Sequence, residues 1–262
     1  MNRLSPPLLA ITILFSSVSL MRGEVLITIE QKDQRNGEVQ ESTIYLSGDR
    51  YRGDINQISY IFRSDLQKLW LINRHDETYA EWTPSDVSRL KMRLQDAKAE
   101  AHNFLHEEME SLSPEQRRQL EEAEVRQGKL EEPEVTYRKI ASDQKYGPWR
   151  CDLYERYENE EKQSEVCVAT MKSLNLRPED FSALYAFLDF FDIGPSTSDN
   201  DLLDLRKLAD EIGFEGFPVK ESKLGDNGKV EEVLTVTRIK RTSFPASLFE
   251  LPLRSDHSTA KQ

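Results

Sequence analysis

The sequence predicts an α+β protein in which helices pack over one face of a large antiparallel sheet. Three observations indicate this fold class. Short runs rich in β-branched and aromatic residues occur on both sides of the chain's middle. The connections between the first runs are short and polar, as in an antiparallel meander. Other stretches carry apolar residues at the three- and four-residue spacing of helices.

Six strands are expected before residue 84. In the first, Val25, Ile27 and Ile29 alternate with polar residues, so one of its faces should be buried. The stretch Leu69–Ile72 is apolar at every position, which predicts a strand covered on both faces. The expected strands after the first are Thr43–Leu46, Tyr51–Ile55, Ile58–Arg63, Lys68–Arg74 and Thr78–Trp82.

A long charged helical insertion is expected over residues 85–128. Ser85 or Asp86 would cap its first helix. A narrow apolar stripe begins at Leu90, so this helix should lie on a surface and bury one seam. A second helix should begin with the capping sequence at Ser113.

Strands and helices are both expected in the second half of the chain. The helical stretch 181–191 is apolar nearly all round, which predicts that it is buried. The other expected elements are strands at 135–142, 149–157 and 164–170, a helix at 202–212, and a hairpin of strands 217–223 and 229–241 that turns at Asp226-Asn227-Gly228.

The two cysteines, Cys151 and Cys167, are expected to form a disulfide. Each lies eight residues from Asn159, so a turn centred there would place them directly opposite each other in a hairpin. Closing this loop should stabilise the fold by roughly 3 kcal/mol. A reactive thiol pair would instead favour Cys-x-x-Cys spacing at a helix N-terminus.

The N-terminal segment predicts export. Residues 1–23 have the basic, apolar and small-residue regions of a signal peptide, and the leader holds no cysteine for lipid attachment. A periplasmic or secreted location would allow the disulfide. Residues 24–253 are expected to form a single domain, and residues 254–262 a disordered tail.

Composition limits the partners. The formal net charge is -12, which disfavours nucleic acid and anionic lipid surfaces. No stretch after the leader is long and apolar enough to predict a transmembrane segment.

No catalytic or cofactor-binding signature is found, so we expect no enzyme, no cofactor and no metal. The nearest metal candidate is His102 with His106, one turn apart on the long helix. Asn103 stands where a zinc protease has its glutamate, and two solvated histidines explain the spacing as well. Ser142 and Lys145 match Ser-x-x-Lys without the companion motifs.

Aromatic side chains are the remaining candidates for ligand binding. They are Trp70, Tyr79, Trp82, Phe187 and Phe191. Such side chains offer large contact areas to an apolar ligand, and the aromatic helix 181–191 could cover a cavity. Ordinary core packing between helix and sheet is the alternative.

Several short motifs together resemble a family of exported bacterial proteins. They are Gly48–Asp54, Ile61–Arg63, Trp70–Ile72, Thr78–Trp82, Leu112–Arg118, Cys151–Tyr154 and Glu165–Ala169. The family is that of domain of unknown function 4412, whose fold is similar to LolA-type lipoprotein carriers. The resemblance implies a curved half-barrel sheet with helices over its concave side, and it implies no catalytic residues. The charged long helix departs from family members, in which this helix is often rich in Met and Gln.

Three function classes follow. The first is non-catalytic binding in the cell envelope, with an apolar ligand or acyl chain held under the helical cover. The second is a protein-interaction or structural role, with the charged helical region 86–126 as the contact surface for an envelope protein. A metal-dependent enzyme ranks third.

Overall fold

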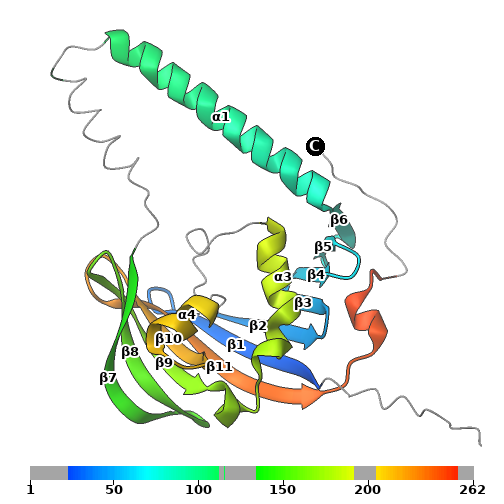
Figure 1. Cartoon of the computed structure of the whole chain (residues 1–262), viewed down its shortest axis with the longest axis vertical. Coiled ribbons are helices and arrows are strands. Elements are labelled where there is room, and N and C mark those ends of the chain that lie inside the picture. Colours follow the sequence, from blue (N-terminus) through cyan, green and yellow to red (C-terminus); the bar gives the residue numbers. More distant parts are fainter. Residues whose placement is uncertain (1–22, 112–114, 116–133, 192–204, 253–262) are drawn as a thin grey trace, which may run out of the picture.

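The protein is built on one curved, open antiparallel sheet of eleven strands (Figure 1). The computed structural model describes residues 23–111, 115, 134–191 and 205–252, and for residues 98, 101–111, 206 and 207 it describes the backbone alone. Nearly all of the expected signal peptide, the expected second helix and the expected C-terminal tail lie outside the described residues.

The strand order is β6-β5-β4-β3-β2-β1-β11-β10-β9-β8-β7, so β6 and β7 are the two edges. The N-terminal meander and the C-terminal strands are joined where β1 pairs with β11. The strands are β1 Glu24–Asp33, β2 Val39–Ser47, β3 Arg50–Ile55, β4 Ile58–Arg63, β5 Lys68–Asn73, β6 Thr78–Trp82, β7 Val135–Tyr146, β8 Trp149–Glu158, β9 Glu161–Thr170, β10 Gly216–Leu224 and β11 Val230–Thr242. The large antiparallel sheet is therefore confirmed, and it dominates the fold more than α+β implies.

Helices cover the sheet only in places. The α-helices are α1 Pro84–Ser111, α3 Ser182–Phe191 and α4 Leu205–Ile212, and the 3-10 helices are η1 Met171–Leu174, η2 Pro178–Phe181 and η4 Ala246–Phe249. Helix α3 contacts β2, β3 and β4, whereas α4 contacts β7 and β10. Helix α1 leaves the β6 edge and projects from the sheet (Figure 1).

A row of directly opposed apolar side chains crosses the N-terminal meander beneath α3. Its members, one from each strand from β1 to β6, are Val25, Leu46, Tyr51, Phe62, Leu69 and Trp82. Opposed residues of neighbouring strands point to the same face of a sheet. All six belong to the main hydrophobic core or pack against it, so this row is the surface on which α3 lies.

The C-terminal segment covers the opposite face of the same meander. Phe249 of η4 is fully buried there against Ile61, Trp70 and Ile72. The Arg50 guanidinium lies 5.0 Å from the centre of the Phe249 ring. The prediction that Leu69–Ile72 is covered on both faces is confirmed, whereas the prediction that the helices pack over one face is wrong, because η4 lies on the face opposite α3.

Cys151 and Cys167 form the expected disulfide, with 5.5 Å between their Cα atoms. The expected register is wrong, because Cys167 lies opposite Leu153. Cys151 lies two positions further along the same face of β8. The hairpin turns on two residues, Asn159 and Glu160, both with positive φ, and the register then shifts by one residue next to Arg156.

Helix α1 differs from the prediction in its capping residue and in how much of its apolar stripe is buried. Its cap is Thr83, whose backbone N–H and hydroxyl both donate to the Asp86 carboxylate, at 2.9 and 2.6 Å. Val87 is buried, but Leu90 and Leu94 are 38% and 61% exposed. The expectation of a buried apolar seam is thus wrong at Leu90 and Leu94, whereas the side chains of the seam from residue 101 onward lie outside what the structure describes. Helix α3 already lies on the apolar row of the meander, so α1 has no sheet surface beneath it.

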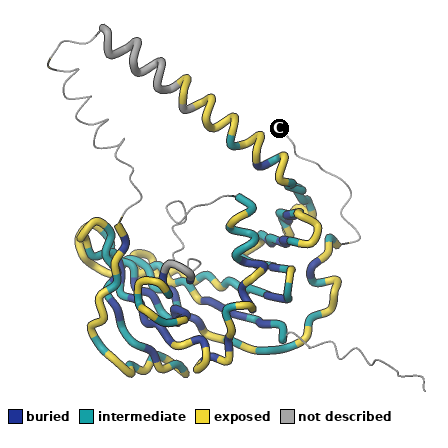
Figure 2. Tube along the Cα trace, viewed as in Figure 1, coloured by how far each residue is buried: buried dark blue, intermediate teal, exposed yellow. Residues whose placement is uncertain are grey.

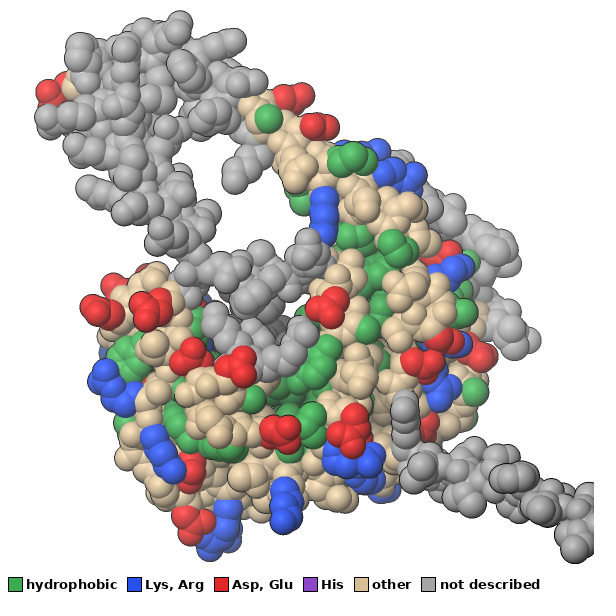
Figure 3. All heavy atoms as spheres, viewed as in Figure 1, with side chains coloured by type: hydrophobic (Ala, Val, Ile, Leu, Met, Phe, Trp, Pro, Cys, Tyr) green, Lys and Arg blue, Asp and Glu red, His purple; other side chains and the backbone are tan. Residues whose placement is uncertain are grey.

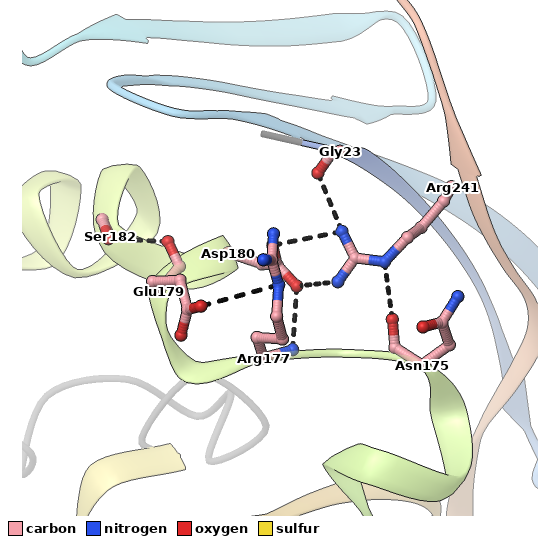
Figure 4. Close-up of polar contacts among 7 residues, drawn as sticks. All are labelled: Gly23, Asn175, Arg177, Glu179, Asp180, Ser182 and Arg241. Atoms are coloured by element: carbon pink, nitrogen blue, oxygen red, sulfur yellow. Dashed lines mark hydrogen bonds and ion pairs between the residues drawn. The ribbon is translucent and has the colours of Figure 1, made fainter. Parts of the chain in front are cut away.

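A buried carboxylate fixes the start of α3 (Figure 4). Asp180 accepts hydrogen bonds from the Arg177 backbone N–H at 2.8 Å and from both terminal nitrogens of Arg241. Arg241 also donates to the carbonyl oxygens of Asn175, at 2.8 Å, and Gly23, at 2.9 Å. These contacts tie the beginning of β1, the end of β11 and the entry into α3 together.

Candidate functional site

The candidate site is a cluster of aromatic rings between α3 and the N-terminal meander. The aromatic cluster consists of Tyr51, Phe62, Trp82, Phe187, Phe190 and Phe191. The Phe187 ring centre lies 5.0 Å from that of Tyr51 and 5.8 Å from that of Phe62. Phe190 lies 5.2 Å from Phe62. These separations are those of favourable aromatic pairs.

Phe191 links the cluster to the edge of the sheet. Its ring centre lies 5.6 Å from Phe187, 5.3 Å from Phe190 and 6.4 Å from Trp82. Trp82 is the last residue of β6, directly before the connection into α1. The cluster therefore runs from the core of the meander to its outermost strand.

Burial decreases along this cluster. Tyr51 and Phe62 are buried, whereas Trp82, Phe190 and Phe191 are half-buried. Along the helical stretch, Phe181, Ala183 and Leu184 are buried, and every apolar residue from Tyr185 onward is only partly covered (Figure 2). The expectation of a fully buried helix is therefore wrong for its C-terminal half. Figure 3 shows hydrophobic side chains gathered along this face of the molecule.

The five aromatic residues expected as ligand-binding candidates lie on two faces of the sheet. Trp82, Phe187 and Phe191 come together in the aromatic cluster. Trp70 and Tyr79 lie on the opposite face, with Ile72 and Phe249. There the Trp70 indole N–H donates to the Glu81 carboxylate at 2.8 Å. The alternation of side chains along β5 and β6 accounts for this division.

The sequence did not single out Tyr51, Phe62 and Phe190 as site residues. Tyr51 and Phe62 are directly opposed in β3 and β4. The hairpin at Asn56-Gln57 fixes this register, so the pair could have been found from the turn. Phe190 joins the cluster because of the side of α3 on which it lies, and no motif in the sequence indicates which side of this apolar helix faces the meander.

The motif Gly48–Asp54 positions the buried end of the cluster. Gly48 turns the chain with a positive φ of 60°. Gly53 leaves room for the Tyr51 hydroxyl, since a Cβ there would lie 2.6 Å from that oxygen. Arg52 faces the other way and donates to Asp54 at 2.9 Å and to the Leu248 carbonyl oxygen at 2.9 Å. The motif thus serves the packing on both faces.

Burial also sets the chemistry of Tyr51. Desolvation raises the pKa of its hydroxyl well above the ordinary value, with smaller contributions from Tyr60 and Asp54. The hydroxyl is therefore neutral at physiological pH, and the buried end of the cluster carries no charge.

Among the described residues, no three His, Cys, Asp or Glu side chains lie close enough together to hold a metal ion. His102 and His106 lie on α1, but their side chains are outside what the structure describes. Within the described ranges, no helix has both the length and the apolar character needed to cross a bilayer.

A profile of the family described as domain of unknown function (DUF4412) matches residues 73–254. The match covers more than half of the chain, and the resemblance seen in the motifs is confirmed. The motif Gly48–Asp54 lies before the matched range. No curated protein matches this chain.

Solved structures similar to this chain share little sequence with it. An uncharacterized conserved protein from Thermus thermophilus has a TM-score of 0.43 and 8% identity, with 90% of this chain and 89% of that one covered. The MucA/MucB complex of Pseudomonas aeruginosa gives a TM-score of 0.38 and 9% identity, covering 86% of this chain and 54% of that one. This chain thus spans about half the length of the second protein.

Proposed function

This chain belongs to the DUF4412 family, and from that premise we propose that it is a non-catalytic binding protein that holds an apolar ligand, such as an acyl chain, against the aromatic cluster. The observation that carries the proposal is the half-exposed end of α3. Phe187, Phe190 and Phe191 stand next to the buried core without being buried themselves. Aromatic and aliphatic side chains beside a few polar groups are typical of ligand sites.

The gradient of burial matches the needs of such a ligand. Tyr51 and Phe62 form a rigid, uncharged base, and the rings of Trp82 and Phe191 form a partly open rim. A ligand laid on this rim would remove apolar surface from water, which favours binding by about 25 cal/mol per Å². The rim rings already contact one another and Phe190, so a ligand would bind to a surface that is largely pre-formed.

A naphthylamine dye that fluoresces in apolar surroundings tests this proposal. We expect saturable binding to the full chain and displacement by dodecanoate. Loss of one aromatic contact is worth about 1 kcal/mol, so Phe191→Ala should weaken binding about fivefold. Ile140→Ala is the matched control, since Ile140 is an exposed apolar residue on β7. Absence of dye binding, or equal losses in the two variants, would contradict the proposal.

The second candidate function is protein interaction through α1. Leu90, Met92 and Leu94 are exposed on this projecting helix. Leu94→Glu would abolish such an interaction and leave dye binding unchanged, because Leu94 lies outside the aromatic cluster. Loss of dye binding in Leu94→Glu would instead assign α1 to the ligand site.

We also propose that the protein works in the periplasm or outside the cell. The disulfide between Cys151 and Cys167 supports this location, because such bonds persist in oxidising compartments. N-terminal sequencing of the protein from the envelope fraction tests it. A new N-terminus between Leu20 and Val25 is expected, and a retained Met1 would contradict export.

A further inference from the structure

The projecting part of α1 carries an apolar stripe whose described side chains, Leu90, Leu94 and Ala97, are exposed. Leu90 and Leu94 are 38% and 61% exposed, whereas Val87, which precedes the stripe on the same side of the helix, is buried. The spacing continues along the helix at Ala97, Ala101 and Phe104. Apolar residues at alternating steps of three and four form the seam of paired helices.

The charges of α1 are divided along its length. Residues 89–98 carry four basic side chains and one acidic one, whereas residues 99–111 carry four acidic side chains and no Lys or Arg. Asp86, which precedes the basic part, is already paired with Arg89. A parallel pair of such helices would place like charges together, and an antiparallel pair would place opposite charges together.

We propose that α1 pairs antiparallel with α1 of a second copy of this chain. The register that aligns both stripes places Leu94 opposite Phe104 of the other copy and Ala97 opposite Ala101. The same register places Arg93 opposite Glu107 at the flank of the seam. The helix of 28 residues is about 42 Å long, so two copies can overlap over several turns while the two sheets stay apart.

Charge favours a second copy of α1 over the following segment of the same chain as the partner of this stripe. Residues 113–125 contain four acidic and two basic side chains. Folded back onto α1, they would bring a net acidic stretch against the acidic half of the helix, which disfavours that pairing. A second copy brings a basic stretch there. This inference is independent of the proposed ligand site, because none of its residues belongs to the aromatic cluster.

Molar mass measured by light scattering over a range of concentrations tests self-association. The full chain should approach twice the mass of one chain as concentration rises, and added salt should weaken this. Leu94→Glu should remain a monomer. Met92→Glu is the matched control, because Met92 is 55% exposed but lies outside the stripe. A wild type that stays monomeric throughout, or equal effects of both variants, would overturn the proposal.

Engineered cysteines test the direction of pairing. Both native cysteines are in the disulfide, so an added thiol is the only free one. Under mild oxidation, Ala97→Cys mixed with Ala101→Cys should crosslink more than either variant alone. Preferential crosslinking of Ala97→Cys to itself would indicate parallel pairing and overturn the register.

A charge exchange gives a second readout of the same register. Arg93→Glu or Glu107→Arg alone should weaken the dimer about tenfold, and the double variant should regain most of the loss. Unfolding curves of each variant should match the wild type, since these positions lie on the projecting part of the helix. No recovery in the double variant would contradict the antiparallel alignment.

Discussion

Replacing phenylalanines along the stretch 181–191 by alanine should cost progressively less stability toward its C-terminal end. Phe181 is 1% exposed, and its ring is stacked on Phe217 with 5.5 Å between the ring centres. Phe181→Ala would leave a closed cavity as well as lose burial, so its expected cost is about 3–5 kcal/mol.

Phe191 lies at the other extreme of this series. Fully burying a phenylalanine is worth about 1.5–3 kcal/mol, and Phe191 is only half-buried, so about 1 kcal/mol is at stake. No sealed cavity forms at the rim, since water can enter. Phe187 should fall between the two, because it contacts both buried rings of the cluster, Tyr51 and Phe62.

Urea denaturation of the oxidised variants measures these differences directly. The three variants should share one dependence on urea concentration and differ in midpoint. A cost for Phe191→Ala equal to that for Phe181→Ala would mean that the end of α3 is part of a closed core. The partly open rim, and the ligand site built on it, would then be refuted.

Three further outcomes are expected. Replacing Cys151 and Cys167 by alanine should cost about 3 kcal/mol, since the bond closes a loop of 16 residues, and urea midpoints equal to wild type would contradict this. Burial raises the pKa of the Tyr51 hydroxyl, so the contribution of this group to the free energy of unfolding is complete below the ordinary tyrosine pKa of about 10 and is lost as pH rises above it. Tyr51→Phe should therefore lose less stability than the wild type between about pH 8 and pH 11. Arg241→Met removes two donors from the buried Asp180 carboxylate and should cost about 2 kcal/mol, so an unchanged melting temperature would contradict the role given to Arg241.

Local patterns made most of the sheet predictable. The alternation of Val25, Ile27 and Ile29 predicted β1 and its buried face, and all three side chains are in the core. The turn at Asp226-Asn227-Gly228 predicted the last hairpin, in which Gly228 has a positive φ. These signals are properties of a few neighbouring residues, so a single sequence contains them.

Features that depend on distant partners were not predictable. The burial of Phe249 depends on β4 and β5, which are far away in the chain. The apolar segment around Phe249 is too short to show a periodicity, so the sequence does not indicate where it packs. The bulge in β9 has no sequence signature, so the cysteines were paired correctly in a wrong register. The stripe of α1 predicted an apolar face but not what covers it.

The candidate site was predictable in part. Trp82, Phe187 and Phe191 were chosen for their aromatic character and do come together, but the same reasoning also chose Trp70 and Tyr79 on the opposite face. Side-chain alternation along β5 and β6 separates the two groups once the register is known. Whether any of these residues binds a ligand stays a prediction.

The most direct test of the account uses the positions of its tryptophans. Trp82 lies in the aromatic cluster, Trp70 on the opposite face of the sheet, and Trp149 in the second half of the sheet. A fatty acid brominated along its chain quenches tryptophan fluorescence on contact. In a variant that keeps only Trp82, with phenylalanine at the other two positions, titration with the brominated acid should give saturable quenching. A variant that keeps only Trp70 should show none. No quenching of Trp82, or equal quenching of both, would contradict binding at the aromatic cluster.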